Sequence, residues 1–333
     1  MEKTASAQSL KGLDLGTSRI VLASLRGDKV DYAPQLNAFV DLPNTRMTEK
    51  MLVAQDILHC VEGSRIYAYG NRSDEFAKFL DGDARRPMRS GVLNPAEPKN
   101  LQMIELLVEG VCGRAGKGEK VCFSVPSAPA ARASDLIFHE RSVVGIFERL
   151  GYTVQSVNEG LAIVYAELKD ANFTGIGMSF GGGMCNICLA YLGLPVFTLA
   201  TVRAGDYIDA SAASVTGETP TTVRLHKENG FRIGAPDGGP LDHALSVYYA
   251  EVVENAVEAL ARAMAESKKL PKFAAPVPIV CAGGTAMVKG FIEELQRAIE
   301  SAALPVEIAE VRRAKDPLNT TAKGALVAAM LNM

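Results

Sequence analysis

The sequence has no tryptophan, and no apolar run in its 333 residues approaches the ~20 that a membrane-spanning helix needs. Without tryptophan there is little support for a surface that stacks nucleic-acid bases, and a formal net charge of −3 gives no overall attraction to phosphate backbones. Residues 1–11 are polar and contain neither the apolar core of a signal peptide nor the apolar face of a membrane-surface helix. We therefore expect a cytoplasmic protein with no nucleic-acid partner and no direct membrane anchor.

Cysteine is also scarce, and the six residues of this type fit reduced, mostly buried thiols. Cys185 and Cys188 have the C-x-x-C spacing that some metal and redox sites use. They lie in an apolar run typical of a strand, where residues three apart point to opposite faces. The spacing therefore does not predict a metal or redox site.

Two segments of the chain resemble each other, Gly12–Ala23 and Gly177–Ala190. Each reads as a strand, a Gly-rich turn and a second strand, and they lie roughly half a chain apart. The chain is also too long for one small core, so we expect a duplicated fold. Because no Pro- or Ser-rich linker separates the halves, they should pack together with a cleft between them.

Strands alternate with helices along the chain, which predicts an α/β fold with helices on both faces of its sheets. Apolar spacing and Gly or Ser/Asp boundaries place the main elements. Strands are expected at 66–70, 120–126, 153–157, 278–282 and 306–309. Helices are expected at 101–111, from the Ser134–Asp135 cap to about 150, and at 159–168, 245–264, 288–302 and 321–331.

Three Gly-rich turns follow buried strands: Gly16-Thr17-Ser18, Gly181–Gly183 and Gly283-Gly284-Thr285. Glycine lets backbone N–H groups approach phosphate oxygens closely, and the carboxylate of Asp14 beside the first turn suits Mg²⁺. One such turn could simply be a tight hairpin. Three in this order predict a site for a nucleoside triphosphate.

The order of segments resembles the actin-like ATPase superfamily, which includes actin, MreB, MamK and the seventy-kilodalton chaperones. The resemblance covers nearly the whole chain. Gly12–Arg19 and Gly177–Asn186 resemble the two phosphate loops of the family. Val157–Ala166 resembles its first connecting helix and Asp316–Ala325 its second connecting segment. Val280–Gly290 resembles its adenosine motif.

Within the superfamily, three details resemble the bacterial filament proteins MreB and MamK. These are Arg86–Leu93, which is similar to an Arg-Pro-Met/Leu-x-x-Gly-Val segment, Val125–Ser127, and Ala204–Asp209. The resemblance implies a duplicated actin-like (ribonuclease H-like) fold with two lobes, a nucleotide cleft and four subdomains. The implied boundaries are 1–34, 76–152 and 313–333 for subdomain IA, 35–75 for IB, 153–204 and 244–312 for IIA, and 205–243 for IIB.

The resemblance also implies roles for single residues. Asp14 would hold Mg²⁺ through water, and Glu159 would orient the attacking water, although it could instead be a helix N-terminal acid favoured by the macrodipole. Arg19 would reach a phosphate or else lie solvated on the surface. The remaining nucleotide contacts would come from Gly16, Thr17, Ser18, Gly181, Gly182, Gly183, Arg224, Gly283, Gly284, Thr285 and Ala286.

The second phosphate loop departs from the family pattern Asp-x-Gly-Gly-Gly-Thr-x-Asp. Ser179 and Asn186 stand where the family has aspartates, and Met184 stands for the threonine. On the ribose side, Val223–His226 aligns with a Glu-Arg-Ile-Lys pattern, so Val223 replaces the glutamate. Mg²⁺ capture and control of water should both be weakened. We therefore expect ATP binding with weak or absent hydrolysis.

The resemblance implies a bacterial actin-like cytoskeletal protein that binds ATP and Mg²⁺ and assembles with itself into filaments for cell shape or intracellular organisation. Adaptor proteins would be its other partners. A small actin-fold chaperone or reactivase ATPase is the alternative, and a small-molecule kinase of the same superfamily is a third. Filament formation with ATP, or ATPase stimulation by a client without filaments, would separate the first two.

Overall fold

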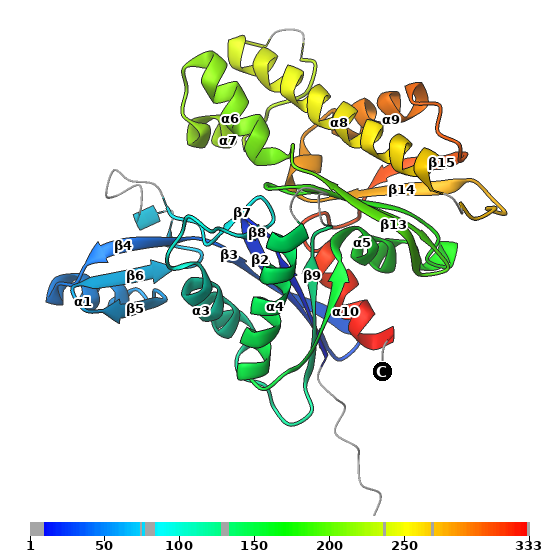
Figure 1. The fold of residues 1–333 in the computed structure, drawn as a ribbon. Coiled ribbons are helices and arrows are strands. Elements are labelled where there is room, and N and C mark those ends of the chain that lie inside the picture. The colour runs from blue at the N-terminus through cyan, green and yellow to red at the C-terminus, as the bar shows by residue number, and fades with distance from the viewer. Residues whose placement is uncertain are drawn as a thin grey trace, which may run out of the picture.

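The computed structural model describes residues 10–73, 75, 76, 84–127, 133–235, 238–267 and 270–331. It contains two five-stranded sheets of the same design (Figure 1). The strand orders are β10-β9-β1-β2-β3 and β15-β14-β11-β12-β13. In both sheets neighbours among the last three strands of this order are antiparallel, and the first two strands are parallel to the hairpin strand beside them. The duplication predicted from the two Gly-rich hairpins is therefore confirmed.

The first lobe is built on the sheet that carries the first hairpin. Its sheet strands are β1 (Leu10–Leu15), β2 (Arg19–Arg26), β3 (Lys29–Leu36), β9 (Lys120–Val125) and β10 (Thr153–Asn158). Its helices are α3 (Asn100–Cys112), α4 (Ala133–Arg149) and α10 (Thr320–Leu331). A small sheet with its own core adds β4 (Phe39–Pro43), α1 (Arg46–Ala54), β5 (His59–Glu62) and β6 (Arg65–Tyr69), and a short hairpin adds β7 (Met88–Arg89) and β8 (Val92–Leu93).

The second lobe repeats this plan. Its strands are β11 (Gly175–Phe180), β12 (Cys185–Tyr191), β13 (Leu194–Thr201), β14 (Val277–Ala282) and β15 (Ile308–Arg313). Its helices are α5 (Glu159–Glu167), α6 (Gly205–Thr216), α7 (Pro220–Glu228), α8 (Pro240–Glu266) and α9 (Phe291–Ser301), with short 3₁₀ turns η2 (Lys169–Ala171) and η3 (Gly284–Met287).

Helices α5 and α10 form a middle layer between the two sheets (Figure 1). Cys122 and Cys188, one from each sheet, face the apolar cluster that these helices share. Helices α3 and α4 cover the far face of the first sheet, and α6, α8 and α9 cover that of the second. The layered order of helix, sheet, helix pair, sheet and helix buries both faces of each sheet.

Glycines let the middle layer pack closely. A Cβ on Gly12 of β1 would lie 2.2 Å from the backbone nitrogen of Leu326, and one on Gly177 of β11 would lie 2.1 Å from the carbonyl oxygen of Gly160. The first glycine of each predicted phosphate motif thus serves strand–helix packing, because any larger residue there would push the connecting helix off its sheet.

Several predicted boundaries needed correction. The helix predicted at 288–302 begins at Phe291, because Gly290 has a φ of 88° and Val288 is extended. The strand predicted at 306–309 runs over Ile308–Arg313. The helix predicted at 245–264 begins earlier, at Pro240, where the Asp242 carboxylate accepts from the N–H of Gly239. Ser134 and Asp135 lie inside the first turn of α4 rather than before it. The four subdomain boundaries stay a prediction.

Cys185 and Cys188 are buried on opposite faces of β12, as expected from strand geometry, and both thiols are free. None of the helices in the described ranges is both long and apolar enough to cross a bilayer.

Candidate functional site

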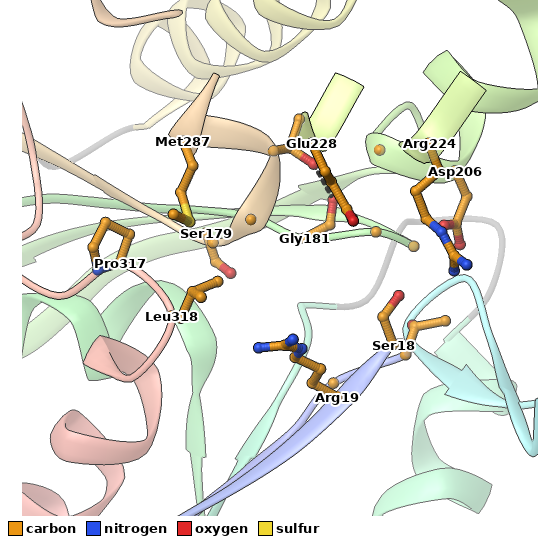
Figure 2. A pocket seen from close by; sticks show the side chains of 18 of the residues that line it. Ser18, Arg19, Ser179, Gly181, Asp206, Arg224, Glu228, Met287, Pro317 and Leu318 are labelled. Carbon is orange, nitrogen blue, oxygen red and sulfur yellow. Dashed lines mark hydrogen bonds between the residues drawn. The ribbon is translucent and has the colours of Figure 1, made fainter. Parts of the chain in front are cut away.

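A cavity of about 580 Å³ lies between the two lobes, and all three predicted Gly turns contribute to its wall. Figure 2 shows Ser18 and Arg19 on the first-lobe side and Ser179 and Gly181 on the second-lobe strands across from them. The predicted residues Asp14, Gly16, Thr17, Ser18, Arg19, Glu159, Gly181, Gly182, Gly183, Arg224, Gly283, Gly284 and Thr285 all line it. Ala286 does not: it is fully buried behind the wall.

The first turn is held by the segment that enters the β7–β8 hairpin. The N–H of Gly91 donates to Thr17 Oγ1 (2.9 Å), and an Arg86 guanidinium nitrogen donates to Ser18 Oγ (2.6 Å). Both hydroxyl oxygens therefore act as acceptors here, while each hydroxyl keeps a hydrogen that it can donate. The turn is fixed in place before any ligand contacts it.

The second turn lies directly against the first. A Cβ on Gly182 would lie 2.8 Å from Ser18 Oγ, and one on Gly183 would lie 2.6 Å from Thr17 Oγ1 and 2.7 Å from the nitrogen of Gly91. The run of three glycines thus allows the two lobes to approach each other, and it also leaves backbone N–H groups near the cavity.

The two glycines of the third turn differ in role. Gly283 has a φ of 95°, and a Cβ there would lie 2.2 Å from the carbonyl oxygen of Phe180, so the position requires glycine. A Cβ on Gly284 would meet only the side chain of Leu318, at 3.9 Å. Gly284 is therefore open toward the cavity, and Thr285 Oγ1 ties this turn to the second one by donating to the Gly181 carbonyl (2.9 Å).

Two carboxylates, Asp14 and Glu159, lie at the base of the cavity. Burial raises the pKa of Asp14 to about 6, against the effect of the hydrogen bond that Ser124 Oγ donates to it (2.8 Å). Burial also raises the pKa of Glu159 to about 8, and repulsion from Asp14 adds to the shift. Two like charges close to each other favour keeping a proton on one of them.

This arrangement predicts a pH-dependent stability. The folded chain holds the proton of Glu159 to a higher pH than the unfolded chain, so stability falls as pH rises from about 4.5 to about 8. Glu159→Gln should therefore gain stability relative to wild type between pH 5 and pH 8, by at least about 1 kcal/mol since one pKa unit is worth about 1.4 kcal/mol. Urea unfolding of wild type and Glu159→Gln at pH 5 and at pH 8 measures this gain in stability. The exposed Glu258→Gln is the control, and equal pH profiles for all three chains would contradict the account.

Asn186 occupies the position of the family's second aspartate, and both of its polar groups are already bonded. Its Oδ1 accepts from the N–H of Ser127 (2.7 Å), and its Nδ2 donates to Glu159 (3.0 Å). Ser179 is a second neutral residue on the cavity wall. Among the described residues, no three His, Cys, Asp or Glu side chains come together as metal ligands. Mg²⁺ beside a bound polyphosphate needs only one or two protein carboxylates, so the Mg²⁺ role implied for Asp14, which lines the cavity, stays a prediction.

The structure does not support the alignment of Val223 on α7 with a ribose-binding glutamate. Val223 is fully buried in the second lobe's core, while Arg224, Lys227 and Glu228 line the cavity. Lys227 Nζ donates to Asp209 in a buried ion pair (2.6 Å). Sequence reasoning missed Lys227 and Glu228. The three- and four-residue spacing from Arg224 is the signal that would have found them.

Other lining residues were also missed as site residues. Arg86 and Gly91 come from the segment whose Arg-Pro pattern was noted only as a resemblance, and Asp206 lies at the start of α6. Pro317 and Leu318 complete the wall near Met287 (Figure 2).

Comparison with solved structures places the fold in the actin-like class. A MamK double helical filament aligns with a TM-score of 0.74 and 19% identity, over 97% of this chain and 99% of that one. MreB 5 of Spiroplasma citri bound to AMPPNP aligns at 0.69 and 14%, over 96% and 95%. The ethanolamine utilization protein EutJ from Carboxydothermus hydrogenoformans aligns at 0.56 and 15%, over 98% and 91%. At these identities the likeness establishes the fold alone.

Curated protein sequences offer no match to this chain. The family model for Volactin, in contrast, matches residues 10–329, which is nearly the whole sequence. The matched span includes both Gly-rich hairpins, the third turn and the two connecting helices that frame the cavity. The chain belongs to the Volactin family.

Proposed function

We propose that this chain is an actin-like cytoskeletal protein that binds ATP in the cavity between its lobes and assembles with itself into filaments. The observation that carries the proposal is the convergence of three Gly-rich turns, from three separate strand ends, on one cavity at the junction of the lobes. Exposed backbone donors at such turns suit a polyphosphate, and the volume falls in the range of ordinary small-molecule sites, roughly 300–1,000 Å³.

The relatives support this proposal through what they contain. One is a MamK filament, and both a MamK mutant and MreB 5 were solved with AMPPNP bound. A ligand that contacts both lobes would favour one lobe arrangement over others, which is how nucleotide could control assembly. Subunits would then join head to tail through an open, heterologous interface. Cell shape or intracellular organisation is the proposed use of such filaments.

We propose that hydrolysis is weak. A water molecule attacking the terminal phosphate must lose a proton to a positioned base, and Glu159 is the candidate. The residues that hydrogen-bond to it are the neutral Ser179 and Asn186, which stand where the family pattern has aspartates, so fewer charged groups remain to orient the water. A phosphate-release assay that found turnover as fast as in MreB would contradict this part of the proposal.

The assembly proposal predicts a sedimentation result. Purified protein should pellet at high speed when ATP and Mg²⁺ are present and stay in the supernatant without nucleotide. A chain that stays monomeric with every nucleotide and at every salt concentration would contradict the filament proposal. ATPase activity stimulated by a second protein, without pelleting, would instead support the chaperone-like alternative.

A further inference from the structure

One residue of the cavity wall, Met184, belongs both to the second Gly turn and to the contact between the lobes. Its carbonyl oxygen accepts from the N–H of Gly181 (3.1 Å), which closes the turn directly before β12 begins. Its side chain lines the cavity but is only 4% exposed. A side chain that faces a cavity and is still almost fully covered is packed against other atoms of the wall.

Those atoms belong to the first lobe. A Cβ on Gly91 would lie 2.6 Å from Met184 Sδ and 3.6 Å from the Cβ of Pro126, so the thioether lies over Gly91, beside the segment that follows β9. Gly91 is fixed in this place, because its N–H donates to Thr17 Oγ1 and its φ of 76° suits glycine. Met184 is therefore an apolar bridge from the turn of the second lobe to the first lobe.

The bridge lies between the proposed phosphate turn and the candidate base. The Gly turn ends at Gly183, and Asn186, which donates to Glu159, comes three residues later. Of the two residues between them, Cys185 is buried in the core of the second lobe, and Met184 faces the cavity. A water molecule that attacks the terminal phosphate has to lie between that phosphate and its base, which is the interval where Met184 forms the wall.

A thioether is poorly suited to hold such a water molecule. Its sulfur is a weak acceptor and carries no donor, whereas an attacking water needs partners that fix its orientation. Threonine, which the family pattern has at this position, carries a hydroxyl group that both donates and accepts. The contacts of Met184 with Gly91 and Pro126 also cover part of the wall that water would otherwise reach.

We propose that Met184 is a water-excluding residue: it closes the space beside the terminal phosphate of bound ATP and so keeps the triphosphate intact. The inference rests on the nucleotide binding proposed above. It adds a cause of weak hydrolysis that is separate from the missing aspartates, because exchanging one apolar side chain, with no charge added, should then restore turnover.

Phosphate release by the full chain with ATP and Mg²⁺ tests the inference. Met184→Thr should release phosphate at least about tenfold faster than wild type, which is the effect of one hydrogen bond to a positioned water. The conservative Met184→Leu should keep the slow rate, because leucine excludes water as methionine does. Met47→Thr is the matched control: it makes the same change at a residue of α1 that is 82% exposed and lies outside the cavity.

Two further measurements make the result specific. Calorimetric titration with AMPPNP should give dissociation constants within about threefold for all these chains, because the rate and not the affinity is expected to change. In an Asn186→Asp background, adding Met184→Thr should again raise the rate at least about tenfold. Thermal unfolding shows whether each variant is folded, and Met184→Gln, which has nearly the length of methionine and provides polar atoms, replaces Met184→Thr if that variant is not.

The outcomes separate this inference from the proposal beneath it. If Met184→Thr leaves the rate unchanged in both backgrounds, or if Met184→Leu raises it as much, the inference is overturned and nucleotide binding stands. If AMPPNP does not bind to wild type, both are overturned. A rate that rises with Met184→Thr in at least one background, and not with Met184→Leu or Met47→Thr, at unchanged affinity, supports the inference.

Discussion

Gly324→Ala is expected to cost at least about 3 kcal/mol of folding stability, the upper end for overpacking a tight core. Gly324 lies on α10 where this helix crosses α5, and a Cβ there would lie 1.8 Å from the carbonyl oxygen of Ala162. The neighbouring atoms are backbone, so neither helix can yield by turning a side chain. The layer between the two sheets would have to separate (Figure 1).

Chemical denaturation measures this cost, and Gly110→Ala on α3 is the matched control. Both glycines are inside helices, but a Cβ on Gly110 would lie 3.7 Å from a methyl group of Leu58, an ordinary contact. Alanine there should leave stability unchanged or raise it by up to about 1 kcal/mol, since it restricts the unfolded chain. Similar effects for the two substitutions would show that the α5–α10 crossing is not the constrained part of the fold.

Gly284→Phe is expected to weaken ATP binding at least about a hundredfold while leaving the fold intact. Its Cβ would meet only Leu318, and a phenyl ring beyond it would extend along the cavity wall beside Val280–Gly290, the segment that resembles the adenosine motif. Loss of the contacts of a nucleoside with an apolar wall is worth about 3 kcal/mol, and each 1.4 kcal/mol is tenfold in affinity.

The control for this variant is Gly239→Phe, which adds the same ring at an exposed position before α8, with no atom within 4 Å of its Cβ. Both variants should unfold at the temperature of wild type. Calorimetric binding that is lost in the first and kept in the second would place the nucleoside in this cavity. Unchanged ATP binding by Gly284→Phe would show that the nucleoside does not lie against this part of the cavity wall.

The duplicated topology was predictable from sequence because strand, Gly turn, strand is a local pattern that appears twice. The three turns were predictable for the same reason. Their meeting at one cavity also followed from the resemblance, because the strand ends of an actin-like fold converge there. Edge strands such as β3 and β13 were not predicted. Their side chains are largely exposed, so they lack the continuous apolar signal of the central strands.

Other features depend on contacts between distant segments and were missed. No local pattern shows that Arg86 donates to Ser18, since 68 residues separate them. Val223 was aligned with a ribose-binding glutamate, whereas the structure places it in the core; Arg224, which was predicted to contact nucleotide, does line the cavity. The burial of Val223 turns Arg224 and Glu228 toward the cavity, and helical spacing alone fixes that once one buried residue is known. The sequence likewise did not predict that Gly12 and Gly177 allow close strand–helix packing, because that role depends on where the connecting helices lie.

Electron microscopy of the purified chain, with and without ATP, alongside Gly284→Phe under the same conditions, tests most directly the claim that nucleotide in the inter-lobe cavity controls assembly. We predict filaments of wild type with ATP, none without nucleotide, and none of Gly284→Phe with ATP. Wild-type filaments that form equally well without nucleotide, or filaments of Gly284→Phe that match those of wild type, would contradict the account.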